Sequence, residues 1–165
     1  MMKYDWNEFT LRVNVNASET DIYKAWATQD GLEKWFLSKA EFTQPDRNLR
    51  ERNSFIQKDD SYVWNWHGYA DYIGTGEVLR TNEKDLLEFT FTGGCVVRVR
   101  IKQEKGETIC ELTQKMPQEL IEDKQYYYIE CGKGWTYYLT NLKSVLEGGL
   151  DLRNKNCELS KVVNA

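Results

Sequence analysis

Residues 134–149 read GWTYYLTNLKSVLEGG, and this stretch decides the fold because it predicts a long closing helix. Apolar side chains in it and just before it recur at helical spacing and form one stripe: Tyr128, Trp135, Leu139, Leu142 and Leu146. A helix with a single apolar stripe buries that stripe against a partner surface. Acidic residues favour a helix start near Glu122 or Asp123, and the glycines at 148–149 favour a left-handed C-cap. Because the preceding chain is mostly strand-like, we expect the partner to be a sheet.

The sheet is predicted from alternating apolar and polar residues through the middle of the chain. Strands are expected at residues 9–15, 54–58, 62–73, 77–80, 87–91, 97–101 and 107–115. A polar loop is expected at 42–49, and turns are expected at 59–60, 82–85, 93–94 and 105–106. Gly68 is expected to bend the long strand at 62–73, and Gly74 and Gly76 to break the run after it. Consecutive hairpins of this kind form an antiparallel sheet that needs a cover on its apolar face.

Two short helices are expected after the first strand. Ser18 has the residue type of an N-cap, with Asp21 at the acidic first-turn position. Asp30 is expected to cap the second helix, which ends at Trp35 and Phe36. The order is therefore strand, two helices, antiparallel strands and one long helix, which predicts an α+β fold. We expect one domain over residues 1–165, with its core at about 9–150 and a polar tail at 151–165.

Composition excludes several classes of protein. The 165 residues are 41% hydrophobic and 29% charged, a globular balance. The net charge of −4 and the lack of a basic run disfavour nucleic-acid binding. No apolar stretch approaches the roughly 20 residues of a membrane span, and the N-terminus lacks the apolar core of a secretory signal. We therefore expect a cytoplasmic protein, a monomer or a homodimer, with no nucleic-acid or membrane partner.

The cysteines and the single histidine favour no metal or cofactor. Cys95, Cys110, Cys131 and Cys157 are scattered, with no Cys-x-x-Cys pair, so free thiols are expected. A disulfide between Cys95 and Cys110 on neighbouring strands is the alternative. His67 has no metal-ligand pattern around it. We expect no metal site and no cofactor.

Three stretches resemble the START-like (SRPBCC) superfamily, and more closely its activator-of-Hsp90-ATPase-homologue-like (AHSA1-like) branch. They are ASETDIYKAWAT with LEKWF at residues 17–36, YVWNWHGY at 62–69, and the helix segment at 134–148. With the strand order, the similarity extends over about residues 9–150. It implies the helix-grip fold, a curved antiparallel sheet wrapped around a long C-terminal helix with a cavity between them. Members of this group bind apolar ligands, catalyse small-molecule cyclisation or stimulate a chaperone ATPase.

The aromatic side chains are the candidate ligand-binding residues. With the resemblance, we place these around the space between sheet and helix: Trp35, Trp64, Trp66, Phe89, Phe91, Trp135, Tyr138 and Leu139. Trp and Tyr bury a large apolar area and keep one polar group that orients a ligand. The alternative is that these rings simply fill the core. The function expected first is non-enzymatic binding of a small or medium apolar, lipid-like molecule.

Two further functions stay open at this point. One is a protein-interaction module for a chaperone, although the chain shows no separate N-terminal chaperone-docking module. The other is a cyclase-like enzyme, which requires an acid–base pair inside the cavity. His67 is the one candidate base, and Asp71 lies too far along the expected strand to orient it, so we expect a rim or surface histidine. Arg98 and Arg100 alternate with apolar residues and are expected to point outward, with a ligand carboxylate as the alternative partner.

Overall fold

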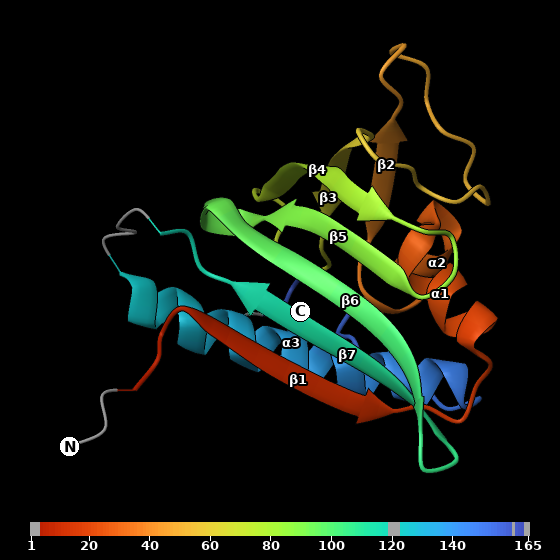
Figure 1. Ribbon diagram of the computed structural model, residues 1–165. Helices are drawn as coiled ribbons and strands as arrows, with labels where there is room; N and C mark the ends of the chain where they lie inside the picture. The colour runs from red at the N-terminus through yellow and green to blue at the C-terminus, as the bar shows by residue number, and fades with distance from the viewer. Residues whose placement is uncertain (1–3, 119–122, 160, 164–165) are drawn as a thin grey trace.

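The computed structural model describes residues 4–118, 123–159 and 161–163. Its elements, in chain order, are β1 (Glu8–Asn14), α1 (Glu19–Ala27), α2 (Gln29–Trp35), β2 (Lys39–Thr43), β3 (Ser61–Asn65), β4 (Ile73–Thr81), β5 (Leu86–Phe91), the 3₁₀ turn η1 (Thr92–Gly94), β6 (Cys95–Glu104), β7 (Glu107–Lys115) and α3 (Lys124–Leu146). The described strands form one seven-stranded antiparallel sheet in the order β1-β7-β6-β5-β4-β3-β2. Helix α3 runs along one face of this curved sheet, and α1 and α2 lie near one end of it (Figure 1). The predicted α+β helix-grip fold is confirmed.

Helix α3 buries the predicted stripe. The side chains of Trp135, Leu139 and Leu142 are buried, and those of Tyr128 and Leu146 pack against the same core. The Asp123 carboxylate accepts a hydrogen bond from the Tyr126 amide at 3.2 Å, so it caps the helix, while Glu122 lies outside the described residues. Gly148 follows the helix with φ of 80°, as the predicted left-handed cap requires.

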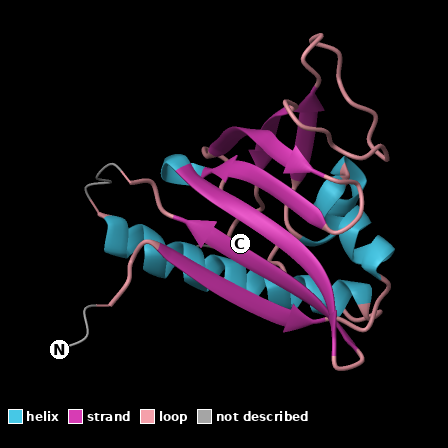
Figure 2. Cartoon of the chain, in the orientation of Figure 1, coloured by secondary structure: helices cyan, strands magenta, loops and turns pink. Residues whose placement is uncertain are grey.

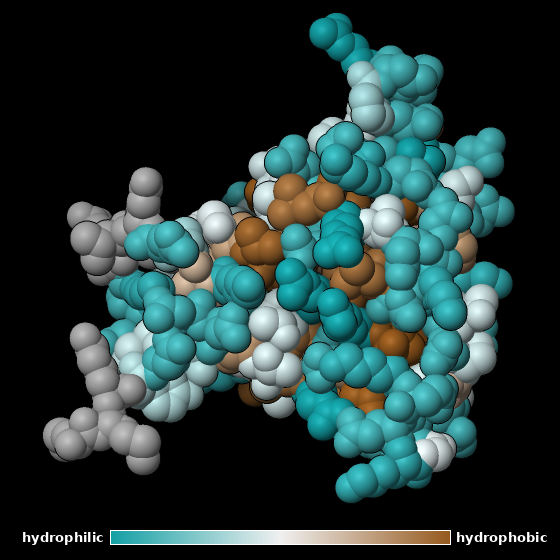
Figure 3. Space-filling model, viewed as in Figure 1, coloured by the Kyte–Doolittle hydropathy of each residue, from teal (hydrophilic) through white to brown (hydrophobic). Residues whose placement is uncertain are grey.

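Strands β5, β6 and β7 follow their predicted alternation. Val97, Val99 and Ile101 of β6 are buried on the face that α3 covers, while Arg98 lies opposite Glu88 and pairs with it at 2.7 Å. The two arginines therefore lie on the outer face, as expected, and Arg100 is exposed. The face seen in Figure 3 is mostly hydrophilic, with hydrophobic side chains showing between the charged ones.

The first helices also form as expected, except for one cap. Ser18 Oγ accepts a hydrogen bond from the Asp21 amide at 3.0 Å at the start of α1. The predicted cap of α2 at Asp30 is wrong, because Thr28 Oγ1 accepts from the Gly31 amide at 2.9 Å and the helix begins at Gln29. Asp30 instead pairs with Arg52 at 2.8 Å.

Three strand predictions in the middle of the chain are wrong. The expected long strand at 62–73 ends at Asn65, and β4 starts only at Ile73. Residues 54–58 are not a strand, because the Ile56 amide donates across to the Ala27 carbonyl at 2.8 Å. Residues 42–43 of the expected loop belong to the short edge strand β2, which buries Ala40 and Phe42. The connection from β2 to β3 is a long loop that extends away from the sheet (Figure 2).

Gly74 and Gly76 lie inside β4 and do not break it. A Cβ at Gly74 would lie 2.7 Å from Cη2 of the Trp66 ring, and a Cβ at Gly76 would lie 2.5 Å from the Tyr62 hydroxyl. These glycines therefore make room for aromatic rings that lie over the strand. This close approach, rather than a strand end, is the reason for a residue without a Cβ.

The tail is held to the core by Arg153 and not by the leucines before it. Leu150 and Leu152, the apolar residues at the start of the tail, are 80% and 45% exposed and do not anchor it. The Arg153 side chain is buried, and its guanidinium donates to the backbone carbonyls at the end of α2: Glu33, Lys34 and Leu37, at 2.9–3.0 Å. Arg153 thus satisfies carbonyls that the end of a helix leaves without partners.

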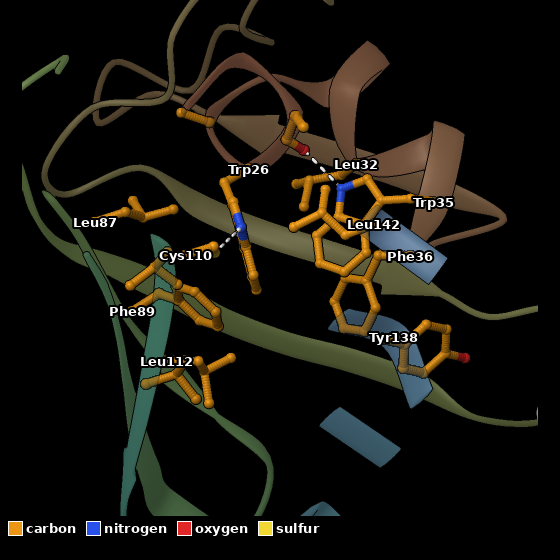
Figure 4. Packing of buried hydrophobic residues seen from close by; sticks show 14 of the residues in the cluster. Trp26, Leu32, Trp35, Phe36, Leu87, Phe89, Cys110, Leu112, Tyr138 and Leu142 are labelled. Atoms are coloured by element: carbon orange, nitrogen blue, oxygen red, sulfur yellow. Dashed lines mark hydrogen bonds between the residues drawn. The ribbon is translucent and has the colours of Figure 1, made fainter. Parts of the chain in front are cut away.

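All four cysteines, which lie within the described residues, are free thiols, as expected. Cys110 lies opposite Val13 and Ile101, whereas Cys95 lies opposite Phe91, so no disulfide joins Cys95 and Cys110. The Cys110 sulfur accepts a hydrogen bond from the Trp26 indole at 3.3 Å (Figure 4). In the described part of the chain no helix is long and apolar enough to cross a membrane.

Candidate functional site

A pocket of about 440 Å³ lies between α3 and the β3–β4 connection. Its described lining residues are Phe36, Trp66, Tyr69, Tyr72, Phe91, Thr92, Tyr126, Tyr127, Glu130, Cys131, Gly134, Trp135 and Tyr138. Nine of these thirteen carry aromatic rings, so the wall is apolar with a few polar tips. This size and this composition are typical of small-molecule sites.

The inner end of the pocket is a set of packed rings. Phe36, directly after α2, stacks on Trp135 of α3 with ring centroids 5.0 Å apart and planes 29° apart. Phe91 of β5 lies 5.1 Å from Trp135, and Tyr138 meets Phe36 edge-on at 4.8 Å. The Trp135 indole N–H donates to Gln114 Oε1 on β7 at 2.7 Å, which fixes the ring against the sheet. Each ring at this end is therefore held by another element.

One side wall comes from the β3–β4 connection. Trp66 lies over Gly74, and its ring centroid is 5.6 Å from that of Tyr72. The Tyr72 hydroxyl donates to Thr92 Oγ1 at 2.9 Å, which ties this connection to η1. Tyr69 and Tyr72 are about half exposed. They form the rim of the pocket, which opens to solvent on this side.

The opposite wall is one face of α3. Cys131, Gly134 and Tyr138 follow at helical spacing on the face that carries Trp135, with Tyr127 and Glu130 one turn earlier. A Cβ built at Gly134 would have no heavy atom within 4 Å outside the local helix backbone. Gly134 is therefore not required by close packing, and it leaves open space on the pocket side.

The polar groups of the wall are mostly uncharged. Burial raises the pKa of the Tyr138 phenol and of the Cys131 thiol, so both stay protonated at neutral pH. Thr92 adds a hydroxyl at the rim. Glu130 is the one charged side chain among the described lining residues. The site offers ring faces and hydroxyl groups to a ligand, together with a single carboxylate.

The structure brings four of the eight candidate residues to this pocket: Trp66, Phe91, Trp135 and Tyr138. The other four lie in the core beside it: Trp35, Trp64, Phe89 and Leu139. Trp35 donates its indole N–H to the Ala25 carbonyl at 2.9 Å, and Trp64 stacks on Tyr62 with centroids 3.9 Å apart (Figure 4 shows Trp35 and Phe89). The first set lines the pocket, and the second set lies behind it in the core.

Several lining residues were missed by the sequence reasoning. Cys131 lies four positions before Trp135, and Gly134 lies four positions before Tyr138, so helical spacing could have placed both beside the predicted site residues. Phe36 follows Trp35 at the end of α2, and only the packing of α2 on α3 shows which of the two rings reaches the pocket. Tyr69 and Tyr72 lie in a connection that strand periodicity does not describe.

The single histidine is not among the described lining residues of this pocket. His67 lies half-buried in the β3–β4 connection, outside the lining residues. Burial lowers its pKa, and the charges of Arg153 and Lys155 lower it further. Within the described ranges no three His, Cys, Asp or Glu side chains gather in a way that could hold a metal ion.

A second pocket of about 610 Å³ lies where α1 and α2 meet the end of α3. Its wall includes Asp21 and Asp30, but also Lys24 and Lys34. Charges of both signs are present in equal number among these four, so the wall selects neither anions nor cations. The aromatic pocket is the stronger candidate site.

A curved antiparallel sheet around a long C-terminal helix, with an aromatic pocket between them, defines a helix-grip protein. The family model described as Activator of Hsp90 ATPase homolog 1-like protein matches residues 16–147, and the chain belongs to this family. No curated protein matches the sequence.

Solved structures show the same fold. Protein SSP2350 from Staphylococcus saprophyticus aligns with a TM-score of 0.69 at 16% identity, over 88% of this chain and 96% of that one. The Aha1 dimer from Colwellia psychrerythraea aligns with a TM-score of 0.65 at 17% identity, over 86% and 97%. DynU16, from the dynemicin biosynthetic locus, aligns with a TM-score of 0.65 at 16% identity, over 90% of this chain and 50% of that one.

Proposed function

We propose that this protein binds a small or medium apolar molecule non-covalently in the aromatic pocket between α3 and the β3–β4 connection. The observation that carries the proposal is the open space at Gly134 beside the Phe36–Trp135 stack. Burial of apolar ligand surface against these rings supplies about 25 cal/mol per Å² before the costs of binding are subtracted. The pocket volume suits a molecule of moderate size.

The wall residues have distinct roles in this proposal. Trp66 and Phe91 face the ligand from the sheet side, and Trp135 faces it from the helix. The hydroxyl group of Thr92 orients it by a hydrogen bond. Because Trp66 is held over Gly74 and Trp135 is held by Gln114, these walls are preformed, which lowers the cost of ordering them on binding.

Two other functions rest on the family alone. One similar structure is an Aha1 dimer and another comes from a biosynthetic locus. The fold is therefore compatible with a chaperone-associated module and with a cyclase-like enzyme. An open aromatic pocket favours ligand binding over either. We propose that the chain acts as one domain in the cytoplasm, as a monomer or a homodimer, without a cofactor.

The experiment fills the pocket at one glycine and not at another. Gly134 lines the pocket, whereas Gly132, in the same helix, does not, and neither has close neighbours at its Cβ position. Fluorescence titration with the neutral dye Nile red compares the wild type with Gly134→Leu and Gly132→Leu. We expect Gly134→Leu to lose at least ten-fold in affinity and Gly132→Leu to match the wild type.

Equal affinity of the three proteins would overturn the proposal, and so would the absence of binding to the wild type. Native mass spectrometry of the protein purified from its host adds a second readout. A retained small-molecule mass in the wild type, lost in Gly134→Leu, is the expected result.

A further inference from the structure

The aromatic pocket carries a charge bias that the binding of an apolar molecule does not require. Glu130 is the one charged side chain among the described residues of the wall, and it is an acid. Around it on α3 lie Tyr126, Tyr127 and Gly134, which line the pocket with it. A carboxylate in an aromatic wall favours a cationic group, because the faces of Tyr and Trp rings are also negative.

The existing partner of Glu130 does not cancel this bias. Lys133 pairs with Glu130 at 2.7 Å, but the Lys133 side chain is 68% exposed and is not part of the described wall, and the Glu130 side chain is itself 46% exposed, so it lies at the rim of the pocket. An exposed ion pair between positions i and i+3 of a helix is worth at most about 0.5 kcal/mol. A ligand cation at the rim of the pocket can therefore replace Lys133 at the carboxylate.

The positive groups on the Tyr138 side are already paired. Arg153 and Lys155 both bind the Asp151 carboxylate, at 2.7 and 2.9 Å. The Arg153 guanidinium also donates hydrogen bonds to the backbone carbonyls at the end of α2. These cations are therefore occupied within the protein, and an anionic ligand would meet Glu130 and the ring faces instead.

We infer that the pocket selects ligands whose apolar body carries an ammonium group, with methylated ammonium favoured because ring faces accept its weakly hydrated surface. This inference rests on the proposed ligand-binding function and names its ligand class. The apolar body lies against Phe36 and Trp135, and the ammonium lies near Glu130 among the tyrosine rings. The net charge of −4 favours the approach of such a cation over that of an anion.

The test compares three probes of similar size: phenyltrimethylammonium, its neutral isostere tert-butylbenzene, and the anion benzenesulfonate. Amide NMR titration of the wild type follows the resonances of Gly134 and Trp135. We expect the cation to bind about ten-fold more tightly than the neutral isostere, which is the size of a favourable cation–π contact with a nearby acid, and the anion to bind most weakly.

Variants assign the preference to Glu130. Glu130→Gln is expected to reduce the advantage of the cation over tert-butylbenzene to about three-fold, since the rings remain. Lys133→Gln, which releases Glu130, is expected to keep or increase the advantage. Glu8→Gln, an exposed acid on β1 outside the pocket lining, is the matched control and is expected to leave it unchanged.

The outcomes separate the two proposals. Tight binding of tert-butylbenzene with no advantage for the cation overturns the ammonium inference and leaves the ligand-binding function standing. No change at Gly134 and Trp135 with any probe overturns both. Preference for benzenesulfonate, or an unchanged cation advantage in Glu130→Gln, overturns the assignment of charge selectivity to Glu130.

Discussion

The phenyl ring of Phe36 stacks on the indole of Trp135, with ring centroids 5.0 Å apart. This contact joins the end of α2 to the middle of α3, and the pocket opens on its solvent side. These two rings therefore pack against the core on one side and form the inner end of the candidate site on the other. Substitutions here are expected to change stability and ligand capture together, whereas substitutions at Gly134 separate them.

Trp135→Phe is expected to destabilise the protein by about 2 kcal/mol, because it removes ring volume and leaves Gln114 Oε1 without the indole donor. Urea unfolding followed by circular dichroism measures the change. The exposed Tyr126→Phe is the control and should stay within about 0.5 kcal/mol of the wild type. A Trp135→Phe protein as stable as the control would show that the Gln114 contact contributes nothing.

Gly134→Ala is expected to stabilise the protein by about 1 kcal/mol, since alanine is the better helix former and its Cβ meets open space. The thermal midpoint of unfolding should rise. Gly31→Ala, in α2, is the opposite case, because its Cβ would lie 2.1 Å from the Lys24 carbonyl oxygen. A loss of stability in Gly134→Ala would mean that this face of α3 is more tightly packed than the structure shows.

Arg153→Met is expected to cost about 3–5 kcal/mol, because it leaves the carbonyls at the end of α2 without their donor and removes the guanidinium from the Asp151 carboxylate. Arg153→Lys should recover little, since an ammonium cannot reproduce the planar fork of the guanidinium. Unfolding by denaturant gives both values. A mild effect of Arg153→Met would show that the tail after α3 is not held by this residue.

Acid is expected to weaken the contact between the Asp151 carboxylate and Arg153. Burial alone would raise the pKa of Asp151, but hydrogen bonds from Arg153, Lys155 and Asn141 outweigh it and hold the pKa well below its ordinary value of 3.8. A lowered folded-state pKa means that the contribution is complete above about pH 4 and is lost as the pH falls below it.

The free energy of unfolding, measured from pH 7 down to pH 2, tests this linkage. Asp151→Asn should show a lower stability at pH 7 and a flatter decline in acid. A parallel decline in the wild type and the variant would assign the acid sensitivity to other carboxylates.

The cysteines are expected to react with a thiol reagent in order of exposure. Burial raises the pKa of Cys95 to about 11 and that of Cys110 to about 12, so both should stay unmodified at pH 8 in the folded protein. Exposed Cys157 should react first, and Cys131, half-buried in the pocket wall, should react slowly and be protected by Nile red. Mass spectrometry counts the labels, with urea-unfolded protein as the fully reactive control. Rapid labelling of Cys110 in the folded protein would contradict its burial.

Most of the elements followed from local signals, and the resemblance to the START-like superfamily implied the helix-grip arrangement. The apolar stripe from Trp135 to Leu142, the cap residues Ser18 and Asp123, and the alternation around Val97 and Val99 each predict an element by themselves. These signals are reliable because side chains of a helix or strand repeat their direction at a fixed period. The spacing of apolar residues therefore shows which face is buried. The same alternation predicted that the Arg98 side chain points outward, where it pairs with Glu88.

The middle of the chain was harder to predict for a physical reason. Tyr62, Trp64 and Trp66 alternate as in one long strand, but the chain turns after Asn65, and Trp66 folds back over Gly74. The glycine that looked like a strand end is the place where a ring lies on the backbone. Alternation shows which face a ring takes and does not show where pairing with the neighbouring strand stops.

Periodicity over a few residues was enough to predict α1, α2 and α3, the strands β1 and β5–β7, and the buried stripe of α3. Which rings close the core and which line the open pocket depends on how distant elements pack against one another. Trp35 and Phe36 are adjacent and both apolar, yet only Phe36 reaches the aromatic pocket, since Trp35 is buried with its indole N–H bound to the Ala25 carbonyl. Arg153 likewise contacts the end of α2 only because the tail after α3 packs there in the folded chain. How deeply a side chain is buried depends on contacts between segments that are far apart in the sequence, so a local pattern does not predict it.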